Sequence, residues 1–279
     1  MTPPVALPDW TWPNRAMQFP GPGRPSLGVV FDAAFGETLD DLLALSLLYA
    51  LDNRNECRVV SLSTSKDNLH SAELLEVFNK LFGGRPFPIG MALGKQRGEE
   101  GPVLKAAIAN QTPTIKSVLD TAEPSGQIRN TLTAQQDGNA IGICVGPTDN
   151  FRDLLRLPTA RPVIAAKLKT LYIVGEDPQP IPDWPTATVL VPFRLASALR
   201  WHPAPADFAN ETHPCAQALA AEPHTKINHA GMLAVLHAIR SKDCALPVQV
   251  EQHAAIEKIF AELTVAKPIP RQRPRGFGA

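Results

Sequence analysis

The sequence predicts an α/β protein built on one open, mostly parallel sheet with helices on both faces. Short apolar runs alternate with segments of helical periodicity along most of the 279 residues. This order is typical of a parallel sheet, because consecutive parallel strands need a crossover that is usually a helix. The hydrophobic share of 44% is sufficient for a substantial core. We therefore expect a single α/β domain over residues 27–265.

The predicted strands are short apolar or β-branched runs that are followed by turn-forming residues. The five main runs are 28–31, 58–63, 87–90, 140–145 and 171–175. A sixth run, Ala187–Val191, is a further candidate strand.

The predicted helices show apolar side chains at helical spacing. They are expected over residues 40–51, 68–82, 232–240 and 254–263. The segment 95–137 is rich in Gly, Gln and Thr and has no strong core strand, so we expect a flexible region or a small subdomain there.

Both ends of the chain differ in composition from the expected domain. Residues 1–26 contain seven prolines, which fix φ and remove backbone donors, so an extended arm is expected. Trp10 and Trp12 favour packing of this arm on a surface of its own chain or of a second subunit. Residues 266–279 form a basic, proline-rich tail that is either solvated or a docking segment.

The overall composition excludes several classes of partner. Lys and Arg number 27 and Asp and Glu also number 27, so no nucleic-acid or anionic-membrane partner is expected. No apolar run reaches the roughly 18 residues of a spanning helix, and the N-terminus lacks the order of a secretory signal. We expect a cytoplasmic protein whose cysteines are reduced, since they form no Cys-x-x-Cys pair. They are Cys57, Cys144, Cys215 and Cys244.

The most informative segment follows the first predicted strand. A turn there contains Asp32 and Gly36, and two adjacent carboxylates, Asp40 and Asp41, open the next helix. Adjacent carboxylates repel each other unless the helix dipole, a cation or a hydroxylated ligand offsets the repulsion. The turn at 146–150 also follows a strand, so both segments belong at the carboxyl edge of the sheet, where such folds bind ligands.

This segment resembles the signature of the inosine/uridine-preferring nucleoside hydrolases, Asp-Thr-Asp-Met-Gly-Asn-Asp-Val-Asp-Asp-Ala-Leu-Ala-Leu. Ala34 and Thr38 stand where the signature has acids. Further blocks that are similar to the family occur in order across residues 28–240, and the resemblance implies the nucleoside-hydrolase-like fold. The matching positions are Asp32, Gly36, Asp40, Asp41, Ala44 and Leu45.

The resemblance also implies a calcium site that orients the ribose diol and the attacking water. Of the ligands that the family uses, Asp41 and the backbone carbonyl at Asp149 remain here. Ala34 replaces one carboxylate, which in the family is also the general base, and Gly231 replaces another, or Ala230 if the alignment slips by one residue. Losing two carboxylate ligands is expected to weaken calcium binding on the order of 10²–10⁴-fold.

Four residues are candidates for the remaining chemistry. Asp32, Asp40 and Asn150 are candidates for binding a ribose-containing small molecule, and Asp40 and His229 are candidate catalytic groups. His229 either packs as an ordinary histidine or reaches the pocket and protonates a leaving base. Asp32 and Asp40 are alternatively structural, as acceptors for backbone N–H groups of the turn and the helix start.

Three hypotheses about function follow. In the leading one, a nucleoside-hydrolase-like protein has lost calcium and the general base, needs no cofactor and keeps a role in binding or assembly, in a homo-oligomer. In the second, an active N-glycosidase uses calcium at a rearranged site, where Glu37 and Asp149 join Asp32 and Asp41 as ligands. In the third, the chain is an unrelated α/β protein.

Overall fold

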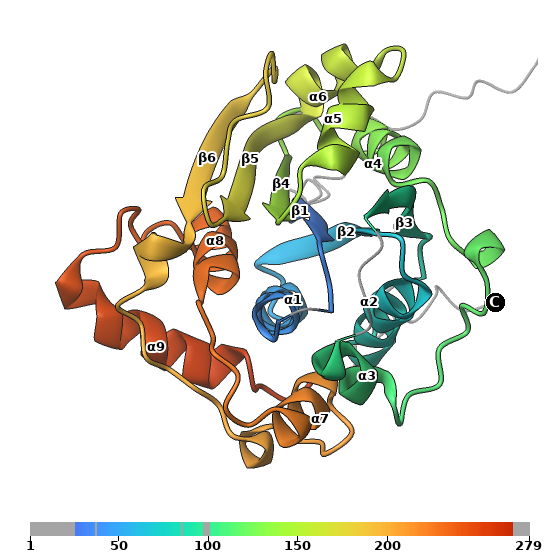
Figure 1. Ribbon diagram of the computed structural model, residues 1–279. Coiled ribbons are helices and arrows are strands. Elements are labelled where there is room, and N and C mark those ends of the chain that lie inside the picture. Colours follow the sequence, from blue (N-terminus) through green and yellow to red (C-terminus); the bar gives the residue numbers. More distant parts are fainter. Residues whose placement is uncertain (1–25, 37, 85, 97–100, 270–279) are drawn as a thin grey trace, which may run out of the picture.

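Six parallel strands form one open sheet in the computed structural model, which describes residues 26–36, 38–84, 86–96 and 101–269 (Figure 1). Their order across the sheet is β3-β2-β1-β4-β5-β6, so the chain changes direction between β1 and β4. The predicted α/β class is confirmed, as are four of the five main strands and the candidate sixth; the third strand, predicted over 87–90, begins two residues later and continues to Gln96. The strands are β1 Leu27–Ala33, β2 Cys57–Lys66, β3 Ile89–Gln96, β4 Ala140–Val145, β5 Leu168–Gly175 and β6 Ala187–Pro192.

Helices cover both faces of the sheet (Figure 1). One face carries α1 (Asp40–Asn53), α2 (Leu69–Leu81) and α8 (Ala230–Ile239), and α1 packs closely against α8. The other face carries α4 (Pro124–Thr133), α5 (Asp149–Arg156) and α6 (Ala160–Lys167). Outside these layers lie α3 Pro102–Ile108, α7 Pro214–Ala221, α9 His253–Leu263 and the 3-10 turns η1 Val118–Asp120, η2 Phe193–Ala196, η3 Pro205–Asp207 and η4 Val250–Gln252.

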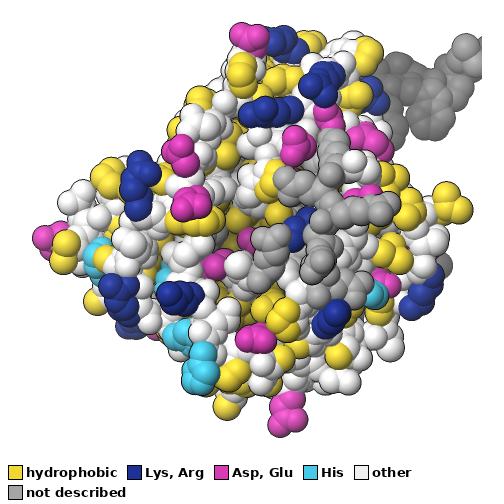
Figure 2. All heavy atoms as spheres, in the orientation of Figure 1, with side chains coloured by type: hydrophobic (Ala, Val, Ile, Leu, Met, Phe, Trp, Pro, Cys, Tyr) yellow, Lys and Arg dark blue, Asp and Glu magenta, His cyan; other side chains and the backbone are white. Residues whose placement is uncertain are grey.

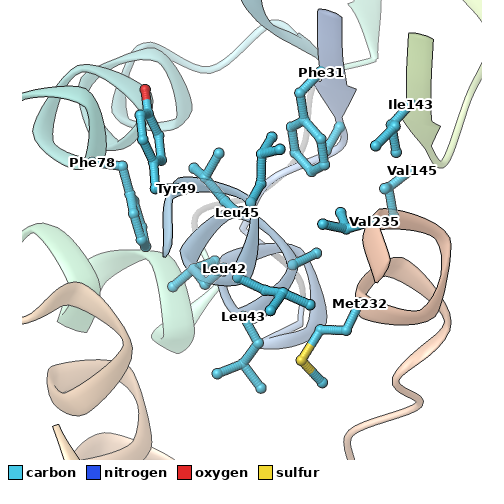
Figure 3. Packing of buried hydrophobic residues seen from close by; sticks show 14 of the residues in the cluster. Phe31, Leu42, Leu43, Leu45, Tyr49, Phe78, Ile143, Val145, Met232 and Val235 are labelled. Atoms are coloured by element: carbon cyan, nitrogen blue, oxygen red, sulfur yellow. The ribbon is translucent and has the colours of Figure 1, made fainter. Parts of the chain in front are cut away.

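The core has two parts, one on each face of the sheet. Successive side chains of a strand point to opposite faces, so Phe31 joins the cluster under α1 and α8, while Val30 joins the cluster under α4 to α6. Figure 3 shows Phe31 of β1 and Leu45 of α1 packed toward Val235 of α8. Burial on both faces explains why the strands read as apolar runs rather than as alternating patterns.

The expectation of a flexible region or small subdomain at 95–137 was wrong for the part that the structure describes. Helix α4 packs on β2 and β3, and its Ile128 and Leu132 are fully buried. The helix was missed because these two side chains are nearly its whole apolar face. Its start is nevertheless well specified, since Pro124 stands in the first turn and the Glu123 carboxylate accepts the N–H groups of Ser125 and Gly126.

Several expectations concern the ends of the chain or its setting. Of the expected arm only Ser26 is described, and of the expected tail only 266–269, so the proposed packing of the arm lies outside the described residues. The homo-oligomer and the cytoplasmic location also stay predictions. All four cysteines are buried and free, as expected. Across the described ranges, no helix combines the length and apolarity needed to cross a bilayer.

Candidate functional site

A pocket of about 260 Å³ opens at the carboxyl edge of the sheet, where the strand order changes direction between β1 and β4. Five segments line it: the loop after β1, the turn after β4, the residue that follows β6, and the beginnings of α1 and α8. Such a crevice is the usual ligand site of an open α/β sheet. Its walls include Ala34, Asp40, Asp41, Gly146, Asn228 and Gly231.

The two strand-end loops meet directly, as the sequence predicted. The Ala34 N–H donates to the Val145 carbonyl at 3.1 Å. Gly146 has a φ of +108°, and a Cβ at this position would lie 3.2 Å from the Cβ of Ala34. A residue with a side chain is therefore disfavoured at 146 both by the backbone conformation and by the close approach of the two loops.

Asp40 and Asp41 open α1 on one wall of the pocket, and both are largely buried. Asp40 Oδ1 accepts the backbone N–H of Asn228 at 2.6 Å and that of His229 at 3.2 Å. Burial raises the pKa of the Asp40 carboxyl above its ordinary value, and these hydrogen bonds partly offset the effect. Asp40 therefore holds α1 to the start of α8 while it also faces the pocket.

Asp32 and Asn150 lie together beneath the edge of the sheet rather than on the walls of the pocket. Asp32 is fully buried, and its Oδ1 accepts the Ser63 hydroxyl at 2.6 Å and the Asn150 amide at 2.7 Å. The same amide also donates to the Thr64 carbonyl at 3.2 Å. This geometry supports the structural alternative for Asp32, since the network joins β1, β2 and α5.

His229 occupies the position just before α8, but its ring points away from the pocket walls. Nε2 donates to the Trp201 carbonyl at 2.6 Å, and the ring stacks on Phe260 with centroids 6.2 Å apart. Burial lowers the pKa of His229, which favours the neutral ring. The packed histidine is thus what the structure shows, and the geometry gives no support to protonation of a leaving base.

The two candidate positions at the start of α8, Gly231 and Ala230, lie differently with respect to the pocket. Gly231 lines the pocket together with Ala34 and Asp41, whereas Ala230 does not. A Cβ at 231 would lie 3.1 Å from the Cβ of Ala44, so α1 and α8 approach each other closely at this point. The two residues that stand in place of the expected carboxylates therefore face the same space as the carboxylate that remains.

The described residues do not fit a calcium site. Calcium takes six to eight oxygen ligands, several of them carboxylates. Within the described ranges, no group of three or more His, Cys, Asp or Glu side chains is placed to hold a metal ion. Asp149 begins α5 and does not line the pocket, and Glu37 lies outside the described residues.

The acids of this region still lie near one another. Burial raises the pKa of the Cys144 thiol, and nearby negative charge raises it further. That charge comes from Asp32, Asp149 and Asp41. Cys144 is the next-to-last residue of β4, so these carboxylates lie near the end of this strand. Among the described residues they form no set of metal ligands.

Two site residues had not been singled out from the sequence. Asn228 lines the pocket, and its side-chain oxygen accepts the N–H of Ala230, the first residue of α8, at 2.8 Å. An Asn just before an apolar helix was the available signal. Phe193 directly follows β6 and is 36% exposed, an unusual position for a large aromatic ring.

A second hollow of about 350 Å³ continues from the pocket along the same edge. The two share Gly146, Pro147 and Phe193, so we treat them as the inner and outer lobes of one cleft. The outer lobe contains Glu176 and Arg152. Figure 2 shows acidic and basic side chains scattered over the face of the molecule that is turned toward the viewer.

Solved structures of two kinds share this architecture. The chain is 12% identical to the type III effector protein XopQ, solved in complex with adenosine diphosphate ribose, with a TM-score of 0.63 over 88% of this chain and 94% of that one. It is 12% identical to a plant nucleoside hydrolase, PpNRh1, with a TM-score of 0.60 over 87% of this chain and 100% of that one. The chain has the nucleoside-hydrolase fold.

An inosine-uridine preferring nucleoside hydrolase from Bacillus anthracis agrees, with 15% identity and a TM-score of 0.54 over 77% of this chain and 82% of that one. No protein-family model and no curated sequence matches the chain. The expected nucleoside-hydrolase fold is thus confirmed by structural similarity. The sequence identities are too low for comparison of sequences alone to detect it. Within this fold, the cleft at the β1/β4 switch is the natural place for a ligand.

Proposed function

We propose that this protein binds a ribose-containing small molecule in the inner lobe and has lost the calcium-dependent hydrolysis of nucleosides. One observation carries the proposal. Ala34 and Gly231 face the same pocket as Asp41, at the positions where the resemblance to nucleoside hydrolases calls for carboxylates. The pocket is present, but the two positions where the resemblance places metal-binding carboxylates carry residues without a functional group. One of these positions, Ala34, is also where the resemblance places the general base.

The remaining polar groups suit a sugar. The carboxylates of Asp40 and Asp41 and the side chains of Thr38 and Asn228 line a pocket whose other walls are mostly apolar. Carboxylates that accept hydrogen bonds from hydroxyl groups offset the repulsion between the two adjacent acids. Two kinds of structural neighbour support a ribosyl ligand, since nucleosides and adenosine diphosphate ribose both contain ribose.

The alternative is an active N-glycosidase with a rearranged site. The raised pKa of Asp40 favours it, because a buried carboxyl that faces a ligand is suited to proton transfer. Against it stands the use of Asp40 Oδ1 as an acceptor for two backbone N–H groups.

Binding and turnover are tested separately. Isothermal titration with inosine, uridine and adenosine diphosphate ribose is expected to give saturable binding to at least one of them. Asp41→Asn is expected to weaken that binding at least about tenfold, since one charge-assisted hydrogen bond contributes on the order of 1.5–3 kcal/mol. Glu211→Gln is the control, because Glu211 is exposed and lines neither lobe.

For turnover, release of free base from inosine and uridine is followed with and without added Ca²⁺. We expect the unmodified protein to be no faster than Asp41→Ala. Calcium-dependent release by the unmodified protein that Asp41→Ala abolishes would establish the alternative. Absence of binding to every ribosyl compound would refute the proposal itself.

A further inference from the structure

Most of the charged side chains described along the cleft are acidic, and this charge bears on which ribosyl compounds the cleft accepts if the proposed function holds. Asp40 and Asp41 face the inner lobe, and Glu176 and Asp177 face the outer lobe. Among the described residues that line the two lobes, Arg152 is the one cation. Even without Asp40, whose pKa is raised by burial, the acids exceed this cation by three to one.

Arg152 is poorly placed to reverse this balance. Its guanidinium Nε donates to the Thr148 hydroxyl at 3.0 Å, and the side chain is exposed. An exposed guanidinium is screened by water and salt, and here it lies in the same lobe as two carboxylates. A phosphate group on the ligand would therefore meet a surface of net negative charge.

Phe193 supplies the second observation. The residue is 36% exposed and belongs to the walls of both lobes, so a base attached to a ribose in the inner lobe would pass beside it. An aromatic face stacks well on a planar base and attracts positive charge through its quadrupole. Carboxylates together with an accessible aromatic ring are the surroundings that a cationic aromatic ring prefers.

We propose that the cleft selects N-ribosyl compounds whose base carries a positive charge, such as pyridinium or quaternised purine nucleosides, and disfavours phosphorylated ones. In this arrangement the inner lobe holds the ribose. Phe193 contacts the base, and Glu176 and Asp177 supply the complementary charge in the outer lobe. Selection acts at binding and requires no chemical step.

The unmodified protein gives the first test. Titration calorimetry compares nicotinamide riboside, a fixed cation, with inosine, which is neutral, and with inosine 5′-monophosphate and adenosine diphosphate ribose, which are anions. We expect the cation to bind about fivefold more tightly than inosine, and the anions to bind more weakly than inosine. The preference for the cation is expected to shrink at about 0.5 M salt, where exposed charges are screened.

Two variants test the assignment of residues. Glu176→Gln with Asp177→Asn is expected to weaken the cation about threefold or more and to change inosine less than twofold, since both side chains are exposed. Phe193→Leu is expected to weaken both nucleosides, the cation more. Glu211→Gln is again the control, and circular dichroism melting verifies that each variant is folded.

The outcomes separate the inference from the proposed function. If the anions bind as tightly as inosine or more tightly, or if the double variant leaves the cation unaffected, the charge inference is wrong while ribosyl binding stands. If none of the four compounds binds, the proposed function fails and the inference fails with it.

Discussion

Asp40 accepts the backbone N–H of Asn228 at 2.6 Å, across 188 residues of sequence. The bond joins the first residue of α1 to a residue whose side chain accepts the first N–H of α8, and both residues line the pocket. It therefore holds the start of α1 next to the start of α8, so that Asp41 and Gly231 line the same pocket. A carboxylate that looks like a catalytic candidate in the sequence is thus also a structural one.

Replacing Asp40 tests this structural role. Asp40→Ala removes the acceptor of the Asn228 and His229 N–H groups, so we expect the free energy of unfolding to fall by about 1–3 kcal/mol. Asp40→Asn keeps an oxygen that can accept both bonds and is expected to lose less. Urea denaturation measures both, and equal stability of Asp40→Ala and the unmodified protein would contradict the prediction.

Asn150 tests whether Asp32 is structural. Asn150→Asp places a second carboxyl beside the fully buried Asp32, in place of an amide that donates at 2.7 Å. One of the paired carboxyl groups must then hold a proton in the folded protein, with a pKa above its unfolded value of about 4. The loss of stability is therefore expected to be larger at pH 8 than at pH 5.

Asn150→Ala is the matched variant, because it removes the donor without adding a charge. Its loss of stability is expected to show little additional dependence on pH. Equal pH dependence of the two variants, measured by urea denaturation, would argue against a close contact between positions 32 and 150.

The burial of His213 leads us to expect that the stability of the fold depends on pH. It is almost fully buried, its ring centroid lies 4.7 Å from that of Phe208, and burial lowers its pKa to about 4. The unfolded chain takes up a proton near pH 6.5 and the folded protein only near pH 4. Stability contributed by the neutral ring is therefore lost as pH falls from about 6.5 to 4, by up to about 3 kcal/mol.

His213→Asn isolates this contribution. The Asn oxygen can still accept the Cys215 N–H that His213 Nδ1 accepts at 3.2 Å, but it does not titrate. Between pH 6.5 and 4, the variant is expected to lose less stability than the unmodified protein in urea denaturation. Parallel curves over this range would show that His213 is not the source.

Restoring the acids tests the assignment of the calcium positions. Ala34→Asp with Gly231→Asp is expected to raise Ca²⁺ affinity at least tenfold, since each position faces Asp41 across the pocket. Because a Cβ at 231 would lie 3.1 Å from that of Ala44, the pair should include Ala44→Gly to make room. Isothermal titration with Ca²⁺ measures the gain.

The control moves one carboxylate by a single residue. Ala34→Asp with Ala230→Asp and Ala44→Gly has the same added charge, but position 230 does not line the pocket. We expect no comparable gain in calcium affinity. A larger gain for this control than for the Gly231 variant would mean that the alternative alignment is the correct one.

The sequence by itself determined the class of fold and the edge of the sheet that carries the site. Strand faces and helix stripes repeat with local periods, so β1 and α1 could be read from residues 28–51 alone. The positions of Ala34 and Gly231 within the resemblance also came from sequence. Short helices such as α5, α6 and α7, each of eight residues, carry too few apolar positions for that signal.

Only the tertiary structure decided which polar groups share a space. Strand β2 has one residue more than β1 beside Val29 and Val30, and this irregularity places Ser63 opposite Asp32. The close packing of α1 against α8 brings Gly231 to Asp41, while the ring of His229 turns away to Phe260. These relationships depend on contacts between residues distant in sequence, which local periodicity does not encode, so they arise only when the helices pack on the sheet.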